Sequence, residues 1–348
     1  METIQKNPSP GGPPPEVVLN QLIFGGLVQK CIWAIAKLTI PDLLKDHPKP
    51  VSRLASETGT DPGALYRVLR TLAAVGLFSE SAGQTFGLAP MGRLLQSGSP
   101  GSMRDFAVMI GENWLWSDWA QILYTVKTGG IAHHKVHGMS TFEYFEQNKE
   151  AGEIFNRAMT NLSELAVPAI LEAYDFSGTG KLVDVAGGHG FLLAAILQQY
   201  PGMQGMLFDL PFVIEGAPRE LETMGVRDRV ELVSGDFFTS VPQGGDCYLM
   251  KHIIHDWDDE QSTRILKNIG AAMNAGGKLL LVEMVVPGEN IPHPSKTLDV
   301  LMMLVEGGME RTADQFRLLL KGAGFNMRRI ISTRSPMSLI EAEPINAV

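Results

Sequence analysis

The sequence predicts two parts: a Rossmann-like α/β domain with seven strands and, before it, a mainly α-helical winged-helix domain. From residue 181 onward, short apolar runs alternate with helical patterns, which is typical of a parallel sheet flanked by helices. Before that residue the apolar spacing is helical almost throughout, with one hairpin signal. The expected boundaries are a disordered leader at 1–15, a winged helix at 16–102, a helical linker and lid at 103–175, and the α/β domain at 176–348.

Composition narrows the class of protein. Of 348 residues, 45% are hydrophobic and 19% charged, which fits a globular chain with a sizeable core. A net charge of −9 argues against nucleic acid or an anionic membrane as a partner. Two cysteines make a disulfide framework unexpected and suit a reducing cytoplasm. No secretory signal and no uninterrupted apolar run of membrane-spanning length is visible, so we expect a soluble, cytoplasmic protein.

The N-terminal third shows helix, helix and hairpin signals in that order. Residues 7–15 are rich in Pro and Gly and should be disordered, whereas 16–45 has helical spacing interrupted at Pro41. After a helical pattern at 51–59, Asp61 is a good N-cap and Pro62 fits the first helical position. One apolar stripe follows, made of Leu65, Val68, Leu69, Leu72 and Val75.

A short hairpin around residues 82–83 completes the winged-helix pattern. The second helix carries only Arg67 and Arg70 as basic residues, so a structural or dimerising role is favoured over DNA recognition. Residues 103–174 are again mostly helical. His133, His134 and His137 cluster there between glycines, without Cys or carboxylate ligands nearby in sequence, and are interpreted as loop or lid residues.

Seven apolar runs account for the expected strands. They are KLVDVA at 181–186, GMLFDL at 205–210, RVELVS at 229–234, DCYLMK at 246–251, KLLLVEMVV at 278–286, MRRIIS at 327–332 and MSLIEA at 337–342.

The turn after the first strand is rich in glycine. Asp184 lies inside the strand, and Gly187, Gly188 and Gly190 let the backbone turn sharply and approach a ligand. The spacing matches neither a dinucleotide fingerprint nor a phosphate-binding Walker sequence. Taken alone, such a turn indicates a nucleotide-type ligand only weakly.

The next two strand ends make an adenosyl ligand the favoured interpretation. Asp209 ends the second strand, where an acidic residue binds ribose hydroxyls. Asp236 and Phe237 follow the third strand, and a carboxylate beside an apolar ring suits an adenine. All three positions belong to the carboxyl edge of the sheet.

These motifs resemble the plant- and bacterial-type small-molecule O-methyltransferases over residues 16–342. The matching segments are DVAGGHG at 184–190, FDLP at 208–211, GDFF at 235–238, LMKHIIHDWDDE at 249–260, VEMVVP at 282–287 and ERT at 310–312. The resemblance implies a homodimer built through the winged-helix region and a cofactor, S-adenosylmethionine (SAM), with S-adenosylhomocysteine as product. By the resemblance and the strand-end pattern, the cofactor-binding candidates are Asp184, Ala186, Gly187, Gly188, Asp209, Leu210, Asp236, Phe237, Lys251 and Trp257.

His255 is the candidate catalytic base. Its segment leaves a strand and enters a helix at the edge where open α/β sheets bind ligands. Methyl transfer from a sulfonium needs alignment, and a phenol with a pKa near 10 also needs its proton removed. A neutral imidazole within hydrogen-bond reach does that. The resemblance assigns the orientation of His255 to Glu283 and Glu310.

The acidic residues around His255 have simpler interpretations than a metal site. Asp256 is expected to cap the helix, contact the cofactor or face the substrate, because adjacent helical side chains diverge. His252 and the run 256–259 are interpreted as a solvated helix start, so no metal is expected. Trp257 either packs on the cofactor, as the resemblance implies, or belongs to the core.

The substrate site rests on fewer signals. Phe155 and Met159 match the family segment that lines the acceptor site, and Asp299, Met302 and Met303 should form the opposite wall. Trp114 or Trp116 could close the mouth of the site. Each of these side chains fits an ordinary core equally well.

The sequence thus predicts methyl transfer from SAM to a phenolic or similar hydroxyl of a small aromatic molecule. Methylation at nitrogen or carbon on the same scaffold remains an alternative, as does a SAM-sensing winged-helix regulator of DNA. Hydroxylation or decarboxylation is disfavoured, because relatives with that chemistry often lose the histidine.

Overall fold

The computed structural model describes residues 12–345, and the chain divides into two compact units after Glu112. The leader expected at 1–15 lies largely outside the described residues. Its last residue is not part of a leader, because Pro15 is the first residue of helix α1. Each unit has its own hydrophobic core and is described by itself.

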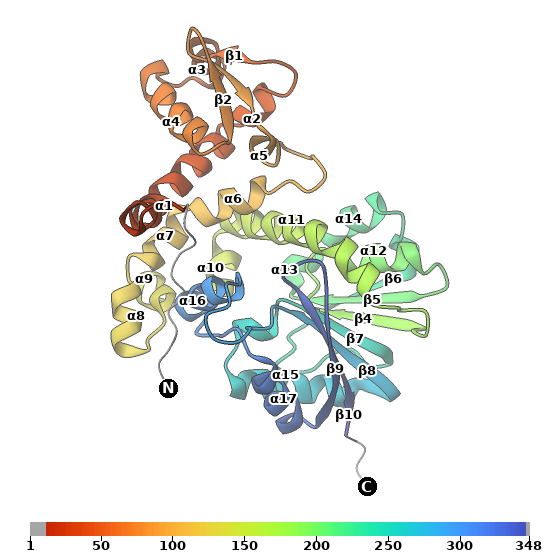
Figure 1. The fold of residues 1–348 in the computed structure, drawn as a ribbon. Helices are drawn as coiled ribbons and strands as arrows, with labels where there is room; N and C mark the ends of the chain where they lie inside the picture. Colours follow the sequence, from red (N-terminus) through yellow and green to blue (C-terminus); the bar gives the residue numbers. More distant parts are fainter. Residues whose placement is uncertain (1–11, 346–348) are drawn as a thin grey trace. The chain divides into compact units, whose positions relative to one another are not determined.

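The first unit contains the helices and the hairpin that the sequence predicts (Figure 1). Its strands form a small antiparallel sheet in the order β1-β3-β2. The elements are α1 (Pro15–Lys37), α2 (Ile40–Leu43), β1 (Lys49–Pro50), α3 (Val51–Thr58), α4 (Pro62–Ala74), β2 (Phe78–Ser81), β3 (Thr85–Leu88), α5 (Pro90–Arg93) and α6 (Arg104–Gly111).

Local sequence signals explain α4. Asp61 caps the helix by accepting a hydrogen bond from the Ala64 amide at 2.7 Å, and Pro62 occupies the first helical position. Leu69 and Leu72 are fully buried against α3 and the hairpin. Val75, expected on the same stripe, is instead 42% exposed, because the helix has already ended at Ala74.

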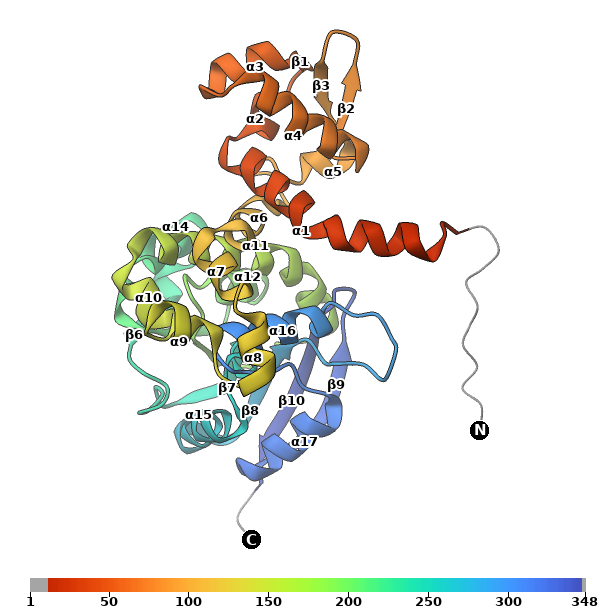
Figure 2. The same ribbon diagram turned by 90° about the vertical axis from the view of Figure 1, so that its left-hand side faces the viewer.

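Helix α1 carries an unpaired apolar face. Its N-terminal half projects away from the other elements of its unit (Figure 2). By length and hydropathy alone α1 would be long enough to cross a bilayer. Its apolar run is not uninterrupted, because Asn20, Gln21 and Lys30 lie within it. The exposed apolar side chains are Val17, Val18, Leu19, Leu22, Ile23, Phe24 and Leu27.

The second unit begins with five helices: α7 (Asn113–Trp119), α8 (Ile122–Thr128), α9 (Ala132–His137), α10 (Thr141–Gln147) and α11 (Lys149–Ala173). His133 and His137 lie on helix α9, not in a loop, and a carboxylate is present after all. Asp118 of α7 lies 2.7 Å from the Nδ1 atom of His133 and 3.3 Å from the Nε2 atom of His137. Tyr144 packs against both imidazole rings.

The rest of this unit is a seven-stranded sheet in the order β6-β5-β4-β7-β8-β10-β9, in which only β10 runs antiparallel to its neighbours. All seven predicted strands are present. They are β4 (Lys181–Val185), β5 (Gln204–Asp209), β6 (Val230–Ser234), β7 (Gly245–Lys251), β8 (Met273–Glu283), β9 (Phe325–Ser332) and β10 (Ser338–Pro344).

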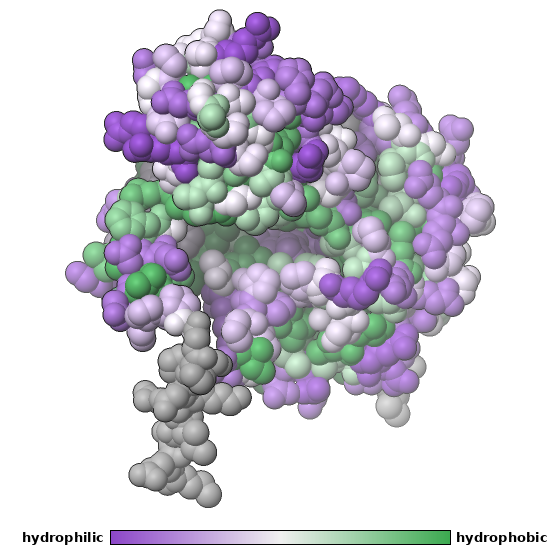
Figure 3. All heavy atoms as spheres, turned by 45° about the horizontal axis from the view of Figure 1, so that its top comes forward, coloured by the Kyte–Doolittle hydropathy of each residue, from purple (hydrophilic) through white to green (hydrophobic). Residues whose placement is uncertain are grey.

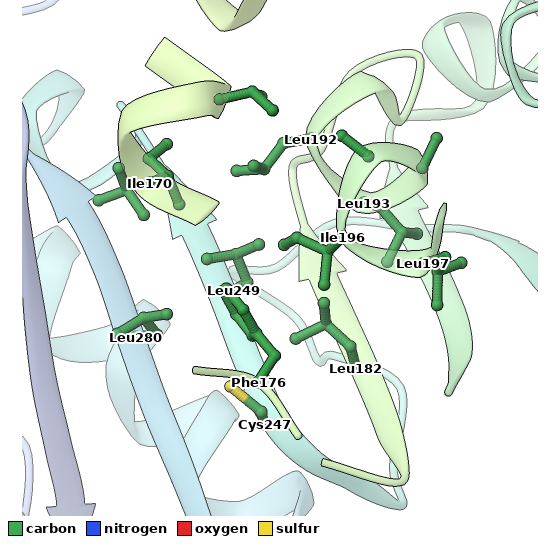
Figure 4. Packing of buried hydrophobic residues seen from close by; sticks show 14 of the residues in the cluster. Ile170, Phe176, Leu182, Leu192, Leu193, Ile196, Leu197, Cys247, Leu249 and Leu280 are labelled. Atoms are coloured by element: carbon green, nitrogen blue, oxygen red, sulfur yellow. The ribbon is translucent and has the colours of Figure 1, made fainter. Parts of the chain in front are cut away.

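Helices cover both faces of the sheet (Figure 1). One core lies between the sheet and helices α11 and α12, where Ile170, Leu193 and Leu249 are fully buried (Figure 4). The other core involves α15 and α17. The remaining helical segments are α12 (Phe191–Gln199), α13 (Pro211–Ile214), α14 (Ala217–Thr223), η1 (Arg227–Arg229), η2 (Ile254–Asp256), α15 (Asp259–Ala272), α16 (Ser295–Val305) and α17 (Ala313–Gly322).

Polar and apolar residues are both present at the surface. Hydrophilic residues occupy much of the face shown in Figure 3, with hydrophobic patches between them. The sheet, with both faces covered, leaves its strand ends as the place where polar groups can meet a ligand.

Candidate active site

A cavity of about 260 Å³ opens at the carboxyl ends of β4, β5, β6 and β7. Side chains from these strand ends form one part of its wall, and helices α10 and α11 form another. The sequence-predicted site residues that line it are Asp184, Ala186, Gly187, Gly188, Asp209, Leu210, Asp236, Phe237, Lys251, Asp256, Trp257, Phe155 and Met159.

The turn after β4 needs its small residues. Ala186, Gly188 and Gly190 all have positive φ, a conformation that larger side chains rarely adopt. Gly187 is required for space: a Cβ atom there would lie 2.5 Å from a Leu207 methyl carbon and 2.6 Å from the Asp184 carboxylate. The turn therefore brings its backbone close to the strand and leaves it facing the cavity.

Asp209 fastens the turn from the next strand. Its Oδ2 atom accepts a hydrogen bond from the Gly188 amide at 2.8 Å, and its Oδ1 atom accepts one from the Leu210 amide at 2.7 Å. Burial raises the pKa of Asp209 to about 6, although both amide hydrogen bonds act in the opposite direction. At neutral pH the carboxylate is thus charged and already oriented along the cavity wall.

Asp184 and Lys251 lie on the neighbouring strands β4 and β7 and interact electrostatically. Burial raises the pKa of Asp184 to about 7, and the ammonium of Lys251 opposes that change. Burial also lowers the pKa of Lys251, against the pull of Asp184 and Glu283. The Oδ2 atom of Asp184 has no hydrogen-bond partner although it is buried. It can therefore accept a hydrogen bond from a ligand on this side of the cavity.

The end of β6 supplies a carboxylate and a ring. Asp236 is held by the Phe238 amide, which donates to its Oδ1 atom at 2.8 Å. Phe237 and Phe238 both pack edge-on against Trp257, with ring centroids 5.9 and 4.7 Å away. The indole Nε1 of Trp257 is buried without a partner, which leaves a second unpaired polar atom in a residue that lines the cavity.

These residues fit an adenosyl cofactor with an amino-acid tail. Asp209 and Asp236 offer acceptors to hydroxyl and amino groups, and Phe237 offers an apolar face. The unpaired Oδ2 of Asp184 suits a cationic amino group.

The other end of the cavity is aromatic. Phe142 stacks on Trp257 at 6.1 Å, and Phe145 stacks on Phe155 at 4.8 Å between ring centroids. Met159, one turn along α11 from Phe155, lines the same wall. Such a set of ring faces accommodates a flat apolar molecule.

Sequence reasoning missed several lining residues. Phe142 and Phe145 lie on α10, where the run TFEYFEQ was visible as an aromatic patch, but nothing local showed that it faces the site. His252, expected in a solvated helix start, is instead half-buried and lines the cavity. Other lining residues without a prior assignment include His189, Phe212, Asn156, Thr160 and Ile253.

His255 lies on η2 and is 5% exposed. Its Nδ1 atom is 2.6 Å from the Oε1 atom of Glu310, which fixes the ring. Its other nitrogen, Nε2, lies 3.4 Å from the Oδ1 atom of Asp256. His255 itself does not line the cavity, whereas Ile253, Asp256 and Trp257 around it do. Nε2 therefore lies beside a residue, Asp256, that borders the cavity.

Glu283 supports His255 in a different way from Glu310. Its Oε1 atom accepts hydrogen bonds from the amides of Ile253 and Ile254, at 3.1 and 3.0 Å, so Glu283 holds the backbone that carries the histidine. The structure gives no hydrogen bond between Glu283 and the imidazole. Burial raises the pKa of Glu283 to about 7, opposed by its attraction to His255.

Asp256 does not cap the following helix. Asp258 does so, accepting from the Gln261 amide at 2.8 Å. Asp256 and His255 do not diverge either, because η2 is a tight 3-10 turn and not an α-helix. Burial raises the pKa of Asp256 to about 7, against the attraction of His255.

Five residues considered for the substrate site do not line the cavity. The Oδ1 atom of Asp299 accepts a hydrogen bond from the Glu310 amide at 2.8 Å, so Asp299 supports the catalytic segment from behind. Met302 is buried in the unit, and neither it nor Met303 is among the lining residues. Trp114 packs edge-on against Phe145, one layer outside the cavity. Trp116, the alternative to Trp114, does not line the cavity either.

Two family models match the chain. Residues 116–326 match an O-methyltransferase domain, and residues 20–98 match an O-methyltransferase dimerisation domain. A phenazine O-methyltransferase of Lysobacter antibioticus is 42% identical over 340 residues, which cover 98% of this chain and 99% of that protein.

Solved structures agree with the family models. The crystal structure of LaPhzM superposes with a TM-score of 0.92 at 42% identity, covering 96% of this chain and 100% of the other. CalO1, a methyltransferase in calicheamicin biosynthesis solved in its S-adenosylhomocysteine-bound form, has a TM-score of 0.82 at 33% identity, covering 94% and 98%. The chain therefore belongs to the SAM-dependent O-methyltransferases that carry an N-terminal dimerisation domain.

Proposed function

We propose that the chain methylates a phenolic hydroxyl of an uncharged, planar aromatic molecule, with His255 as general base oriented by Glu310 and Glu283. The coarser statement, SAM-dependent O-methylation of small aromatic metabolites, follows from family membership. The observation that carries the finer proposal is the short contact between His255 and Glu310 behind an aromatic cavity.

SAM, when bound, supplies an activated methyl group on a positively charged sulfur. Asp209, Asp236, Phe237 and the turn at 186–188 would hold it, with Asp184 facing its cationic amino group. The chain's own task is then to bind the acceptor in line and to remove its proton. His255 would take the hydroxyl proton on Nε2 while the methyl group passes from sulfur to the acceptor oxygen, and Glu310 would stabilise the resulting imidazolium.

The lining of the aromatic end indicates which acceptors fit. Among the lining residues that the structure describes, Lys251 is the one lysine or arginine, and the charges of Asp184 and Glu283 act on it. A carboxylated acceptor would have to compete with these two carboxylates for a single cation. Asn156, Thr160 and Ser163 are neutral polar residues of the lining, on the same helix as Phe155. An uncharged ring system with one hydroxyl is therefore the best match.

A panel of acceptors with labelled SAM tests this proposal. Neutral polycyclic phenols should be methylated at least roughly tenfold more efficiently than their carboxylated analogues, because burying an unpaired carboxylate is costly. His255→Ala should bind SAM normally and lose about 100- to 10,000-fold in kcat. Faster methylation of the matching aromatic amines, or full activity of His255→Ala, would contradict the proposal.

We also propose that the first unit joins two chains into a homodimer, as the dimerisation-domain match supports. The apolar side chains exposed along α1 are the surface that a second copy would cover. In this assignment the first unit, which ends at Glu112 and not at residue 102 as expected, serves dimerisation, and residues 176–348 carry the chemistry, in the cytoplasm.

A further inference from the structure

Arg311 is the largest fully buried side chain among the described residues. A buried guanidinium is costly unless its charge is paired and its N–H groups are used. Arg311 does not line the cavity, so it does not contact a ligand there. Its role must be inferred from its hydrogen bonds.

The guanidinium bridges the two ends of the turn that carries His255. Nη1 donates to the Ile254 carbonyl at 2.8 Å, and Nη2 donates to the Trp257 carbonyl at 2.8 Å. These carbonyls lie one residue before and two residues after His255. One rigid, planar group thus fixes the span of backbone that contains both His255 and Asp256.

The same group ties the turn to the start of α15. Its Nε and Nη2 atoms donate to the Oδ1 atom of Asp259 at 3.0 and 2.8 Å. Asp259 is largely exposed, with a side-chain exposure of 71%, so this ion pair is the weaker part of the arrangement. The contact with the Ile254 carbonyl is buried, and the contact with the Trp257 carbonyl is partly buried.

The backbone of Arg311 is itself held in place. Its carbonyl accepts a hydrogen bond from the Val286 amide at 2.9 Å, just beyond the end of β8. The preceding residue, Glu310, binds the imidazole of His255. Consecutive residues therefore hold the ring and the backbone of the same histidine.

Gly308 confines the turn from the same loop. A Cβ atom at this position would lie 2.1 Å from the His255 carbonyl oxygen and 2.3 Å from the Asp256 carbonyl carbon. The loop approaches the turn so closely that only glycine fits, although Gly308 does not have a positive φ. This contact is independent of the charge on Arg311.

We infer that Arg311 is a positioning residue: with Gly308, it sets the place of the His255 turn and so the aim of the base. The inference rests on the proposed function, because it gives His255 the proton-removing role. A slightly displaced base removes the proton of a weakly acidic hydroxyl less efficiently, so methylation of that acceptor slows. A hydroxyl that ionises unaided needs no base, so its methylation rate should change little.

Two acceptors of one shape but different acidity test the inference. One is a phenol with a pKa of about 10 and the other carries an electron-withdrawing group that brings its pKa to about 7. Arg311→Lys keeps the charge but cannot span two carbonyls. We expect its kcat to fall roughly 10- to 100-fold on the weaker acid and less than about threefold on the stronger one, with SAM affinity unchanged. Arg317→Lys is the matched control, since Arg317 is exposed and pairs only with Asp314, and it should change neither rate.

Equal losses of Arg311→Lys on both acceptors would show a merely structural role and overturn the inference. If Arg311→Lys does not fold, Gly308→Ala displaces the turn without changing charge and should give the same acid-selective loss; an equal loss there would also overturn it. His255→Ala, measured in parallel, distinguishes a failure of the proposed base from a failure of the role of Arg311. If the kcat of His255→Ala also falls equally on both acceptors, His255 is not the base. If only His255→Ala loses more kcat on the weaker acid, the base assignment stands and the role of Arg311 is refuted.

Discussion

At the scale of single residues, the site works through competition between burial and charge. Burial alone lowers the pKa of His255, but Asp256, Glu283 and Glu310 outweigh it and raise the pKa to about 9. A histidine with that pKa is protonated at pH 7 and has no free lone pair for a substrate proton. The bound sulfonium, being positive, would lower the value again.

The pH profile should reflect this competition. Only neutral His255 accepts a proton, so kcat/KM for the acceptor should rise as the pH increases and level off near pH 9. Glu310→Gln removes a carboxylate that raises the pKa of His255. The rising limb of Glu310→Gln should therefore move to lower pH, while its plateau falls because the ring is less well oriented.

Initial rates between pH 6 and 10 with saturating SAM would measure both effects. Glu343→Gln is a suitable control, because Glu343 pairs with Arg328 near the surface, away from the site. A rising limb that stays in place in Glu310→Gln would show that another group controls the profile.

At the scale of elements, the turn between β4 and α12 combines two requirements. Positive φ at Ala186, Gly188 and Gly190 bends the chain, and the absence of a side chain at Gly187 lets it pack on Leu207. Asp209 then fixes the bent backbone through the Gly188 amide. The shape of the cofactor end therefore depends on contacts between two neighbouring strands.

Gly187→Ala should weaken SAM binding. The new methyl group would collide with Leu207 and with the Asp184 carboxylate, so the turn must shift away from its place on the cavity wall. We expect the Kd for SAM to rise at least roughly tenfold, as measured by calorimetry. Gly178→Ala is the matched control, because a Cβ there meets no atom within 4 Å. An unchanged Kd in Gly187→Ala would contradict the packing argument.

At the scale of the whole molecule, the apolar side chains along α1 have no covering partner within the described part of the chain. Leu22 and Ile23 are 72% and 69% exposed. A helix with the length and hydropathy of α1 would suit a membrane, yet its C-terminal half packs into the core of the first unit through Ile35 and Ala36. Coverage by a second chain accounts for both observations.

Leu22→Glu should therefore reduce dimerisation. Placing a carboxylate in a subunit interface carries a desolvation cost that an exposed site lacks. Sedimentation should show the wild type at twice the mass of one chain and the variant shifted toward the monomer. Leu318→Glu on α17 is the matched control, since Leu318 is 71% exposed outside the first unit. A dimer that persists in Leu22→Glu would place the interface elsewhere.

The sequence alone determined the elements and the cofactor edge. The seven strands, the Asp61 cap and the glycine turn follow from periodicity and local chemistry, which act over a few residues. The carboxyl ends of parallel strands must meet at one edge, so Asp209 and Asp236 could be assigned to one site before any coordinates.

Only the tertiary structure decided which distant residues meet. Asp118 reaches His133, Asp299 holds Glu310, and Phe142 faces the cavity, and none of these contacts has a local signal. The direction of a side chain depends on how helices pack, and small changes in that packing redirect it. For the same reason the sequence could nominate His255 and Glu283, but only the fold showed that Glu283 holds the backbone of the histidine instead of its ring.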